Sequence, residues 1–240
     1  FFGSGAVFFS IETESAVISD INKPLMETYK AIRDRPVDLT AVLRIHHNHH
    51  SESYYYKVRE LEPSDEIEKA ARFIYLNRVC WNGLYRENLN GKFNVPIGTK
   101  KKVLLPTDDF VRLSVKLSKA EILSSDFADV IASAGEGDFL FVDPPYVSWG
   151  SSATFRKYTA KVFSWDDQIR LRDALVGAHN RGAQFILTNS ANICVMNLYR
   201  EFEFKQVVGR SNVLAAKTDA RGEYKEFVVG NYEWSAASAG

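Results

Sequence analysis

The sequence Phe-Leu-Phe-Val-Asp-Pro-Pro-Tyr occupies residues 139–146, and its first four residues have the apolar character of a strand. Ligands of open parallel sheets bind beyond the carboxyl ends of the strands, so a site is expected at Asp143. The two prolines fix φ and favour an extended backbone at Asp143, which holds its carboxylate and the Pro144 carbonyl in a rigid relation. Two such acceptors suit an amino group, and Tyr146 offers a flat face to a planar base. An ordinary proline-rich turn is the alternative interpretation.

The residues after this stretch have the pattern of a βαβ unit. Ser164, with Asp167 three residues later, predicts a capped helix start, and Gly182 ends that helix before a strand over 184–188. The helix has an apolar stripe at Ile169, Leu171, Ala174, Leu175 and Ala178. A short helix near 192–200 and strands around 204–208 and 225–229 are expected to follow. This order predicts an α/β fold with a doubly wound, Rossmann-like sheet.

The first residues contain a glycine loop, Gly3-Ser4-Gly5, ahead of a predicted strand over 16–19. A dinucleotide fingerprint would have a third Gly where this chain has Phe8, which disfavours a pyrophosphate-binding loop. Asp20 lies 17 residues beyond Gly3, close to the spacing of about 20 at which an acid binds ribose hydroxyls. Asp126 is placed similarly before the 139–142 strand. Each acid could equally be a turn or cap residue.

Composition restricts the class of protein. The chain has 240 residues, of which 45% are hydrophobic and 25% charged, so we expect a globular protein. No apolar run approaches the roughly 18 to 20 residues that cross a bilayer, and Phe1–Phe9 lacks the features of a secretory signal. Cys80 and Cys194 are too few for a disulfide framework and fit a reducing compartment, which predicts a cytoplasmic protein.

The middle of the chain differs from its flanks. A helical pattern over 25–33 ends at Asp34-Arg35-Pro36, and residues 37–117 are rich in His, Tyr, Asn and Arg, with a helix predicted over 64–79. Although the net charge of the chain is zero, residues 71–105 contain seven Lys and Arg and the single acid Glu87, a local charge of +6. This excess is either a solvated basic face or a nucleic-acid contact. We therefore divide the chain into 1–36, an insertion at 37–117, and 118–240.

Four histidines, His46, His47, His49 and His50, have a spacing that could converge on a metal. No Cys lies close and Glu52 is the nearest acid, so a metal site is disfavoured and none is predicted. We expect these residues to form an exposed or DNA-facing loop near Tyr54–Tyr56.

Five separated motifs resemble, in the same order, those of the Dam-type (D12 class) adenine-N6 DNA methyltransferases. They are Phe1–Phe9, Ser19–Asn22, Phe73–Arg78 with Trp81–Arg86, Gly91–Gly98 and Asp143–Tyr146, and the match extends to about Tyr232. Trp81 stands where the family often has Tyr or Phe. The family carries a Gly-Gly-Lys-containing donor-binding segment upstream of the first glycine loop, and we expect further residues ahead of Phe1.

The resemblance implies S-adenosylmethionine as the methyl donor and assigns roles to two sets of residues. Donor-binding residues would be Phe2, Gly3, Ser4, Gly5, Asp20, Asn22, Asp126, Phe127 and Asp143. Within this set, Asp20 would bind the ribose hydroxyls, and Asp126 with Phe127 would hold the adenine of the donor. The catalytic segment that holds the target base would be Asp143, Pro144, Pro145 and Tyr146.

The resemblance also implies double-stranded DNA as the substrate. The insertion at 37–117 would be a mainly helical target-recognition domain, inserted into the methyltransferase core. Its DNA contacts would be Trp81, Asn82, Leu84, Arg86, Asn94, Pro96, Lys100 and Lys101. The basic excess would neutralise phosphates, and a guanidinium can grip guanine O6 and N7 in the major groove. A GATC-like target is the leading expectation.

The predicted activity is site-specific methylation of N6 of an adenine flipped out of the duplex, as in restriction-modification, mismatch marking or phage biology. Two alternatives stay open: a DNA-binding module without catalysis, and a methyltransferase for RNA or a protein amide. Relatives of the second kind usually show Asn at the place of Asp143 and lack a stretch like Asn82–Gly98. The loop Val147–Lys161 is expected to order on DNA binding. The sequence does not fix the oligomeric state and is compatible with a monomer.

Overall fold

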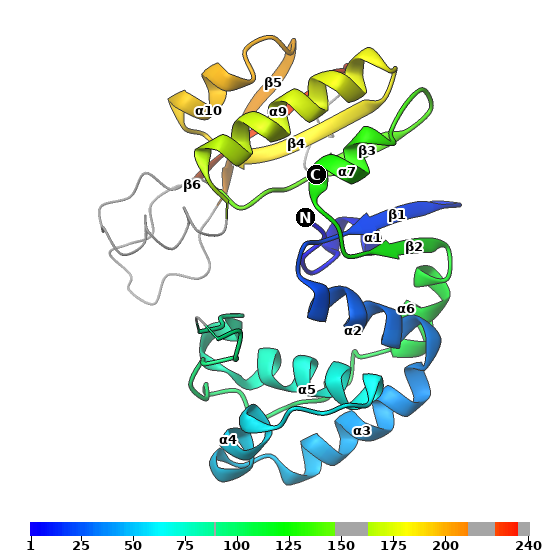
Figure 1. Cartoon of the computed structure of the whole chain (residues 1–240), viewed down its shortest axis with the longest axis vertical. Coiled ribbons are helices and arrows are strands. Elements are labelled where there is room, and N and C mark those ends of the chain that lie inside the picture. The colour runs from blue at the N-terminus through cyan, green and yellow to red at the C-terminus, as the bar shows by residue number, and fades with distance from the viewer. Residues whose placement is uncertain (89, 147–162, 211–223, 235–240) are drawn as a thin grey trace. The chain divides into compact units, whose positions relative to one another are not determined.

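The structure, a computed structural model, describes residues 1–88, 90–146, 163–210 and 224–234 (Figure 1). The chain divides into two compact units, Phe2–Ser124 and Phe1 with Ser125–Gly240. Each unit combines helices with a small sheet, so the predicted α/β class is confirmed. Among the described residues, no helix is both long enough and apolar enough to span a membrane.

The first unit contains a two-stranded parallel sheet and the helices that pack beside it. Its strands pair with Ala16 opposite Ala120 and Ser19 opposite Leu123. Asn22 caps the second helix, because its side chain accepts a hydrogen bond from the Leu25 backbone N–H at 3.1 Å. The elements around this sheet are α1 (Ala6–Ser10), β1 (Ala16–Ser19), α2 (Lys23–Asp34), α6 (Phe110–Leu117) and β2 (Ala120–Leu123).

The same unit continues into a helical segment. It contains α3 (Pro36–His49), α4 (Glu52–Glu60), α5 (Glu66–Val79) and the 3-10 helix η1 (Trp81–Gly83). Asp65 caps α5 by accepting from the Ile67 and Glu68 N–H groups, which confirms the helix predicted there. The predicted break at 34–36 is also found, but Pro36 opens α3 at once, because proline suits a first helical turn. Leu39, Leu43, Tyr55 and Tyr75 are fully buried in the core of this unit.

The histidines do not form the exposed or DNA-facing loop that we predicted from the sequence. His46, His47 and His49 lie on α3, and only His50 follows its end. The His46 ring stacks on Tyr75 at 4.9 Å between centroids, and its Nδ1 lies 2.9 Å from the Tyr54 hydroxyl. Nδ1 of His47 accepts from the Val103 and Leu104 N–H groups. The prediction was wrong because His46 is buried against Tyr75 and His47 accepts hydrogen bonds from the backbone, contacts that a spacing pattern does not reveal.

The burial of His46 predicts an acid-sensitive fold. Burial lowers the pKa of His46 to about 4 from the ordinary 6.5, and the neighbouring His49 lowers it further. The unfolded chain therefore takes up a proton as the pH falls below about 6.5, whereas the folded chain takes it up only near pH 4. We expect the free energy of unfolding to fall by about 2 kcal/mol across that window on account of this residue.

Urea unfolding at several pH values between 7.5 and 4.5 measures this effect. The matched variant is His46→Phe, which keeps a ring for Tyr75 and cannot take up a proton. The variant should show a shallower loss of stability on acidification than the wild type, and parallel pH profiles for the two proteins would contradict the expectation.

The second unit contains a four-stranded sheet with the order β3-β4-β6-β5. β3 and β4 are parallel, with Val142 opposite Leu187, and β6 is antiparallel to both β4 and β5. Its elements are α7 (Phe127–Ala132), β3 (Phe139–Val142), α9 (Trp165–Asn180), β4 (Gln184–Ser190), α10 (Ile193–Leu198), β5 (Phe204–Arg210) and β6 (Tyr224–Gly230). The helix α9 packs on β4 and α7 (Figure 1).

The βαβ unit predicted from the sequence is found here. Ser164 and Asp167 form the expected capping box at the start of α9. Gly182 has φ of +90°, a conformation that favours glycine, and it lies between the end of α9 and the start of β4. The apolar face of α9 buries Leu171 and Leu175 completely against Phe185 and Leu187 of β4. These contacts fix where β3 and β4 end, and therefore where the residues after them lie.

Candidate active site

Asp143 follows directly after β3, at the carboxyl end of the strand. Because β3 and β4 are parallel and in register at Val142 and Leu187, the next residue of β4, Thr188, lies beside Asp143. The Thr188 hydroxyl donates a hydrogen bond to Asp143 Oδ1 at 2.6 Å. No partner for Oδ2 is found within the described parts of the chain, and the residue is exposed. Asp143 thus presents one oriented and one available carboxylate oxygen.

Tyr146 is held by the strand on the other side of β4. Its hydroxyl donates to Glu226 Oε1 at 3.1 Å, and Glu226 lies on β6 with only 7% of its surface exposed. Burial raises the pKa of the Tyr146 phenol, and the carboxylates of Asp143 and Glu226 raise it further, against an opposing hydrogen bond with Thr188. The phenol therefore stays protonated at neutral pH and remains a donor to Glu226.

The segment 143–146 is thus fixed at both ends, with Pro144 buried and Pro145 half-buried between them. Thr188 and Glu226 were not predicted from the sequence. A signal for both exists, since each is a polar residue directly next to the apolar run of its strand. Such a residue is expected at a strand end that faces a ligand or at a buried hydrogen bond, and the sequence alone does not separate the two.

The glycine loop and Asp20 come together in the first unit. Gly3 donates its N–H to Asp20 Oδ2 at 3.1 Å, and Asn22 donates its N–H to Asp20 Oδ1 at 2.9 Å. The Tyr29 hydroxyl donates to the Gly3 carbonyl at 3.0 Å, and burial, followed by the charge of Asp20, raises the pKa of Tyr29 to about 12. Asp20 therefore fixes the loop through both of its carboxylate oxygens.

Gly5 has a packing role within this loop. Its φ is +68°, and a Cβ at this position would lie 2.6 Å from the Phe2 ring. Gly3 has φ of +54° with open space around it, and Ser4 between them is exposed. The loop is thus closed on the side of Phe2 and open at Gly3, where a ligand can approach the backbone.

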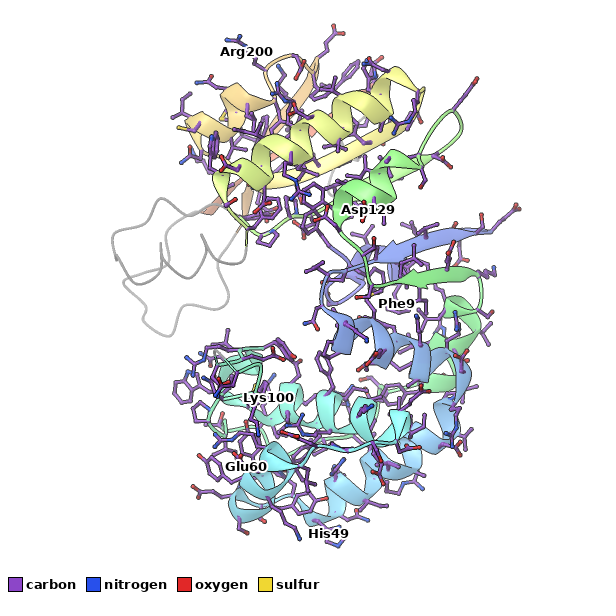
Figure 2. All side chains as sticks on the ribbon, viewed as in Figure 1. Phe9, His49, Glu60, Lys100, Asp129 and Arg200 are labelled. Atoms are coloured by element: carbon purple, nitrogen blue, oxygen red, sulfur yellow. The ribbon has the colours of Figure 1, made fainter. Side chains whose placement is uncertain are left out.

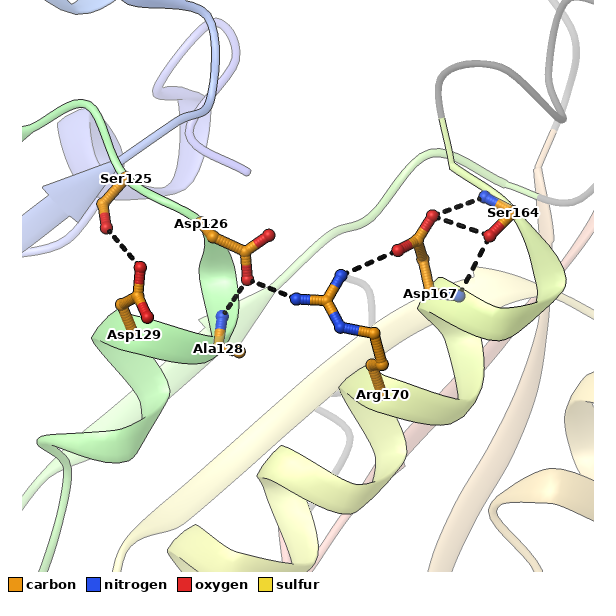
Figure 3. A network of polar contacts seen from close by, with 7 residues as sticks. All are labelled: Ser125, Asp126, Ala128, Asp129, Ser164, Asp167 and Arg170. Atoms are coloured by element: carbon orange, nitrogen blue, oxygen red, sulfur yellow. Dashed lines mark hydrogen bonds and ion pairs between the residues drawn. The ribbon is translucent and has the colours of Figure 1, made fainter.

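Asp126 is the N-cap of α7, and its Oδ1 accepts hydrogen bonds from the Ala128 N–H and from Arg170 Nη2, both at 2.9 Å (Figure 3). The Phe127 ring lies between Phe1, stacked at 5.2 Å, and the Arg170 guanidinium at 5.0 Å. Within the described residues, neither Asp126 Oδ2 nor the Phe127 N–H has a partner. The start of α7 therefore presents one acceptor and one donor side by side.

The residues predicted to contact DNA lie on a tightly held part of the first unit. The backbone N–H of Trp81 donates to the Pro96 carbonyl at 2.9 Å, and the backbone N–H of Gly98 donates to the Val79 carbonyl at 2.7 Å. Asn82 has φ of +54°, which turns the chain outward after Trp81. The exposed members of the predicted set are Trp81, Asn82, Leu84, Arg86, Pro96, Lys100 and Lys101, and Asn94 is half-buried. Figure 2 shows the side chains of this region, with Lys100 labelled.

The basic excess of residues 71–105 divides into structural and available charges. Arg72 donates to the Val58 and Arg59 carbonyls, and Arg78 pairs with Asp108 at 2.8 Å. Lys92 pairs with Glu62 at 2.8 Å. Lys92 stays exposed in this pair, and Arg86, Lys100, Lys101 and Lys102 are exposed as well. Arg86 Nε donates to Asn94 Oδ1 at 2.8 Å and Nη2 donates to the Asn94 carbonyl at 3.4 Å, so its guanidinium is oriented.

The segment 143–146 has acceptors that suit an amino group, and the exposed segment between Trp81 and Lys101 has the charge to contact a nucleic acid. The family model for D12 class N6 adenine-specific DNA methyltransferases matches residues 1–213, and the chain belongs to this family. The resemblance drawn from the sequence motifs is confirmed, and the protein is an adenine-specific DNA methyltransferase.

Curated relatives agree with the family. The chain is 35% identical over 242 residues to the Type II methyltransferase M1.LlaDCHI of Lactococcus lactis, covering 97% of this chain and 84% of the relative. It is 35% identical over 252 residues to the Type II methyltransferase M.MjaIII of Methanocaldococcus jannaschii, covering 97% and 86%. The DNA adenine methylase of Escherichia coli is 29% identical over 217 residues, covering 89% and 78%.

Proposed function

We propose that the protein methylates an adenine flipped out of duplex DNA, with S-adenosylmethionine as the donor and Asp143 as the residue that activates the amino group. The carrying observation is the Asp143 carboxylate, oriented by Thr188 at the end of β3 beside the anchored Tyr146. Flipping is required because N6 of a stacked, paired adenine cannot be approached in line by a methyl donor.

The chain's own residues perform the activation. The exocyclic nitrogen is a poor nucleophile, because its lone pair is delocalised into the ring. Asp143 accepts one N6–H and the Pro144 carbonyl accepts the other, which favours a pyramidal nitrogen with a localised lone pair and stabilises its growing positive charge. Tyr146 supplies a ring face for the base. The donor supplies a methyl group on sulfonium, so that a C–N bond forms as the C–S bond breaks and N6 releases one proton.

The residues assigned to the donor fit its chemistry. The acceptor of Asp126 and the N–H of Phe127 match the N6–H and N1 of an adenine edge. Asp20 accepts one backbone N–H at each oxygen, and the remaining lone pairs can accept from ribose hydroxyls. Phe2, Gly3 and Gly5 form a loop beside Asp20 that is open at Gly3, with exposed Ser4 between the glycines. Asn22 donates its backbone N–H to Asp20 and caps α2, so we propose that it supports the donor site without contacting the donor.

We further propose that residues 37–117 form a target-recognition domain inserted into a doubly wound core of 1–36 and 118–240. The helices α3 to α5 support this division, as does the exposed segment between Trp81 and Lys101. Arg86 would read a guanine, and Lys100 and Lys101 would neutralise phosphates. A GATC-like target is the expectation that the motif resemblance implies. The loop Val147–Lys161, expected to order on DNA, lies outside the described residues.

Transfer of a tritiated methyl group from S-adenosylmethionine to synthetic duplexes tests the proposal. A GATC duplex should be labelled, and duplexes with N6-methyladenine already in place, or with the bases of the site permuted, should not. Sequencing with modified-base detection on DNA from cells that express the protein then defines the full target. DNA binding without label on any adenine duplex would favour the non-catalytic module instead.

Thr188→Val is expected to lower turnover by about 10-fold, because one hydrogen bond to a charged group contributes roughly 1.5 kcal/mol to the orientation of Asp143. The variant keeps the size of the side chain, so the fold should be retained. Thr188→Ser, which restores the hydroxyl, is the matched control and should recover most of the rate. Single-turnover methylation at saturating donor measures the effect, and equal rates for Val and Ser would contradict it.

A further inference from the structure

Arg170 contacts both residues that we assign to the donor's adenine. Its Nη2 donates to Asp126 Oδ1 at 2.9 Å (Figure 3). Its guanidinium carbon lies 5.0 Å from the centre of the Phe127 ring. The chain separates Arg170 from Asp126 by 44 residues, so the contact joins α9 to the start of α7. No motif that we recognise in the sequence includes this arginine.

The Arg170 guanidinium is itself held in place. Its Nη1 donates to Asp167 Oδ1 at 2.8 Å, and Asp167 Oδ2 accepts from the Ser164 N–H and hydroxyl. Asp167 is thus fixed by the capping box of α9, and its pKa is lowered first by the Ser164 backbone N–H. An isolated surface ion pair contributes little to stability. The Arg170 side chain, however, contacts the Asp126 and Asp167 carboxylates and the Phe127 ring at once.

This network determines which oxygen of Asp126 is available. The Ala128 N–H and Arg170 both bind Oδ1, which leaves Oδ2 as the acceptor beside the Phe127 N–H. Without Arg170, the capping bond to Ala128 would be the only hydrogen bond that restrains the carboxylate among the described residues. Rotation of the carboxylate would then move the acceptor away from the Phe127 N–H, which is fixed in the first turn of α7.

We propose that Arg170 is a positioning residue for recognition of the donor's adenine: it fixes the Asp126 carboxylate and the Phe127 ring so that Oδ2 and the Phe127 N–H match the N6 and N1 edge. The inference rests on the proposed role of Asp126 and Phe127. It also links that subsite to the start of α9, because Asp167 and Ser164 hold the other side of the guanidinium.

Calorimetric binding of two donor products to the full protein tests the proposal. S-adenosylhomocysteine carries the amino group, whereas S-inosylhomocysteine has a carbonyl oxygen in place of the amino group and an N–H in place of the N1 acceptor, so neither contact can form as it does with the adenine. For Arg170→Met we expect about 10-fold weaker binding of the first compound, as for the loss of one charged hydrogen bond. Binding of the second should change by less than about 2-fold. KM for S-adenosylmethionine should rise, with kcat at saturating donor unchanged.

Arg172→Met is the matched control, because Arg172 lies on the same helix and pairs with Asp173 and Glu201 instead. It should leave both affinities unchanged. Arg170→Lys keeps the charge but cannot bind Asp126 and Asp167 together, so it should lose part of the discrimination even if the Met variant is unstable. Equal weakening of both compounds, or of neither, would overturn the proposal. Failure of the wild type to bind S-adenosylhomocysteine would instead overturn the proposed function.

Discussion

Asp143→Ala is expected to lower the turnover of DNA methylation by about 10²- to 10³-fold, because it removes an acceptor aimed at the charge that develops on N6. The substitution leaves the strand β3 and the buried Pro144 in place. Asp143 is exposed and is held through Thr188 alone among the hydrogen bonds described, so no core contact is lost. The affinities for donor product and for duplex DNA should therefore stay close to those of the wild type.

Single-turnover methylation of a duplex, with binding of donor product and DNA measured separately, distinguishes a catalytic defect from a binding defect. Asp166→Ala is a matched control, since Asp166 is an exposed carboxylate of the same unit and lies on α9. It should retain full turnover. An Asp143→Ala enzyme with near-native methylation would remove the role that we assign to this carboxylate.

Arg86→Gln is expected to weaken binding to the cognate duplex by about 10- to 100-fold and to relax discrimination at one guanine. The Arg86 side chain is exposed, and Asn94 orients it by accepting from Nε at 2.8 Å and from Nη2 at 3.4 Å. That arrangement suits a bidentate contact with O6 and N7, which a glutamine amide at the same place cannot reproduce with two donors.

Duplexes that carry 7-deazaguanine at one position at a time measure this contact, because the analogue lacks the N7 acceptor. The wild type should lose affinity at one position, and Arg86→Gln should be insensitive there. Lys92→Gln is the matched control from the same basic segment, since Lys92 pairs with Glu62 and should not affect discrimination. If Arg86→Gln responds to every analogue as the wild type does, Arg86 does not read a guanine.

Local secondary structure could be predicted from the sequence wherever it depends on neighbouring residues of the chain. The strand over 139–142, the capping box at Ser164 and Asp167, and the helix ahead of Val79 all follow from periodicity and caps over a few residues. The family followed from motifs in a fixed order.

The partners of those residues were decided by the tertiary structure. Thr188 reaches Asp143 and Glu226 reaches Tyr146 only because β3 pairs with β4, and β4 with β6, in a particular register. Three of the four histidines that were predicted in a loop lie on a helix, and Arg72 and Arg78 form hydrogen bonds within the fold. Residue type and spacing along the chain determine caps, periodicity and the positions of strand ends. Contacts between residues distant in sequence depend on strand register and helix packing, which no local pattern records.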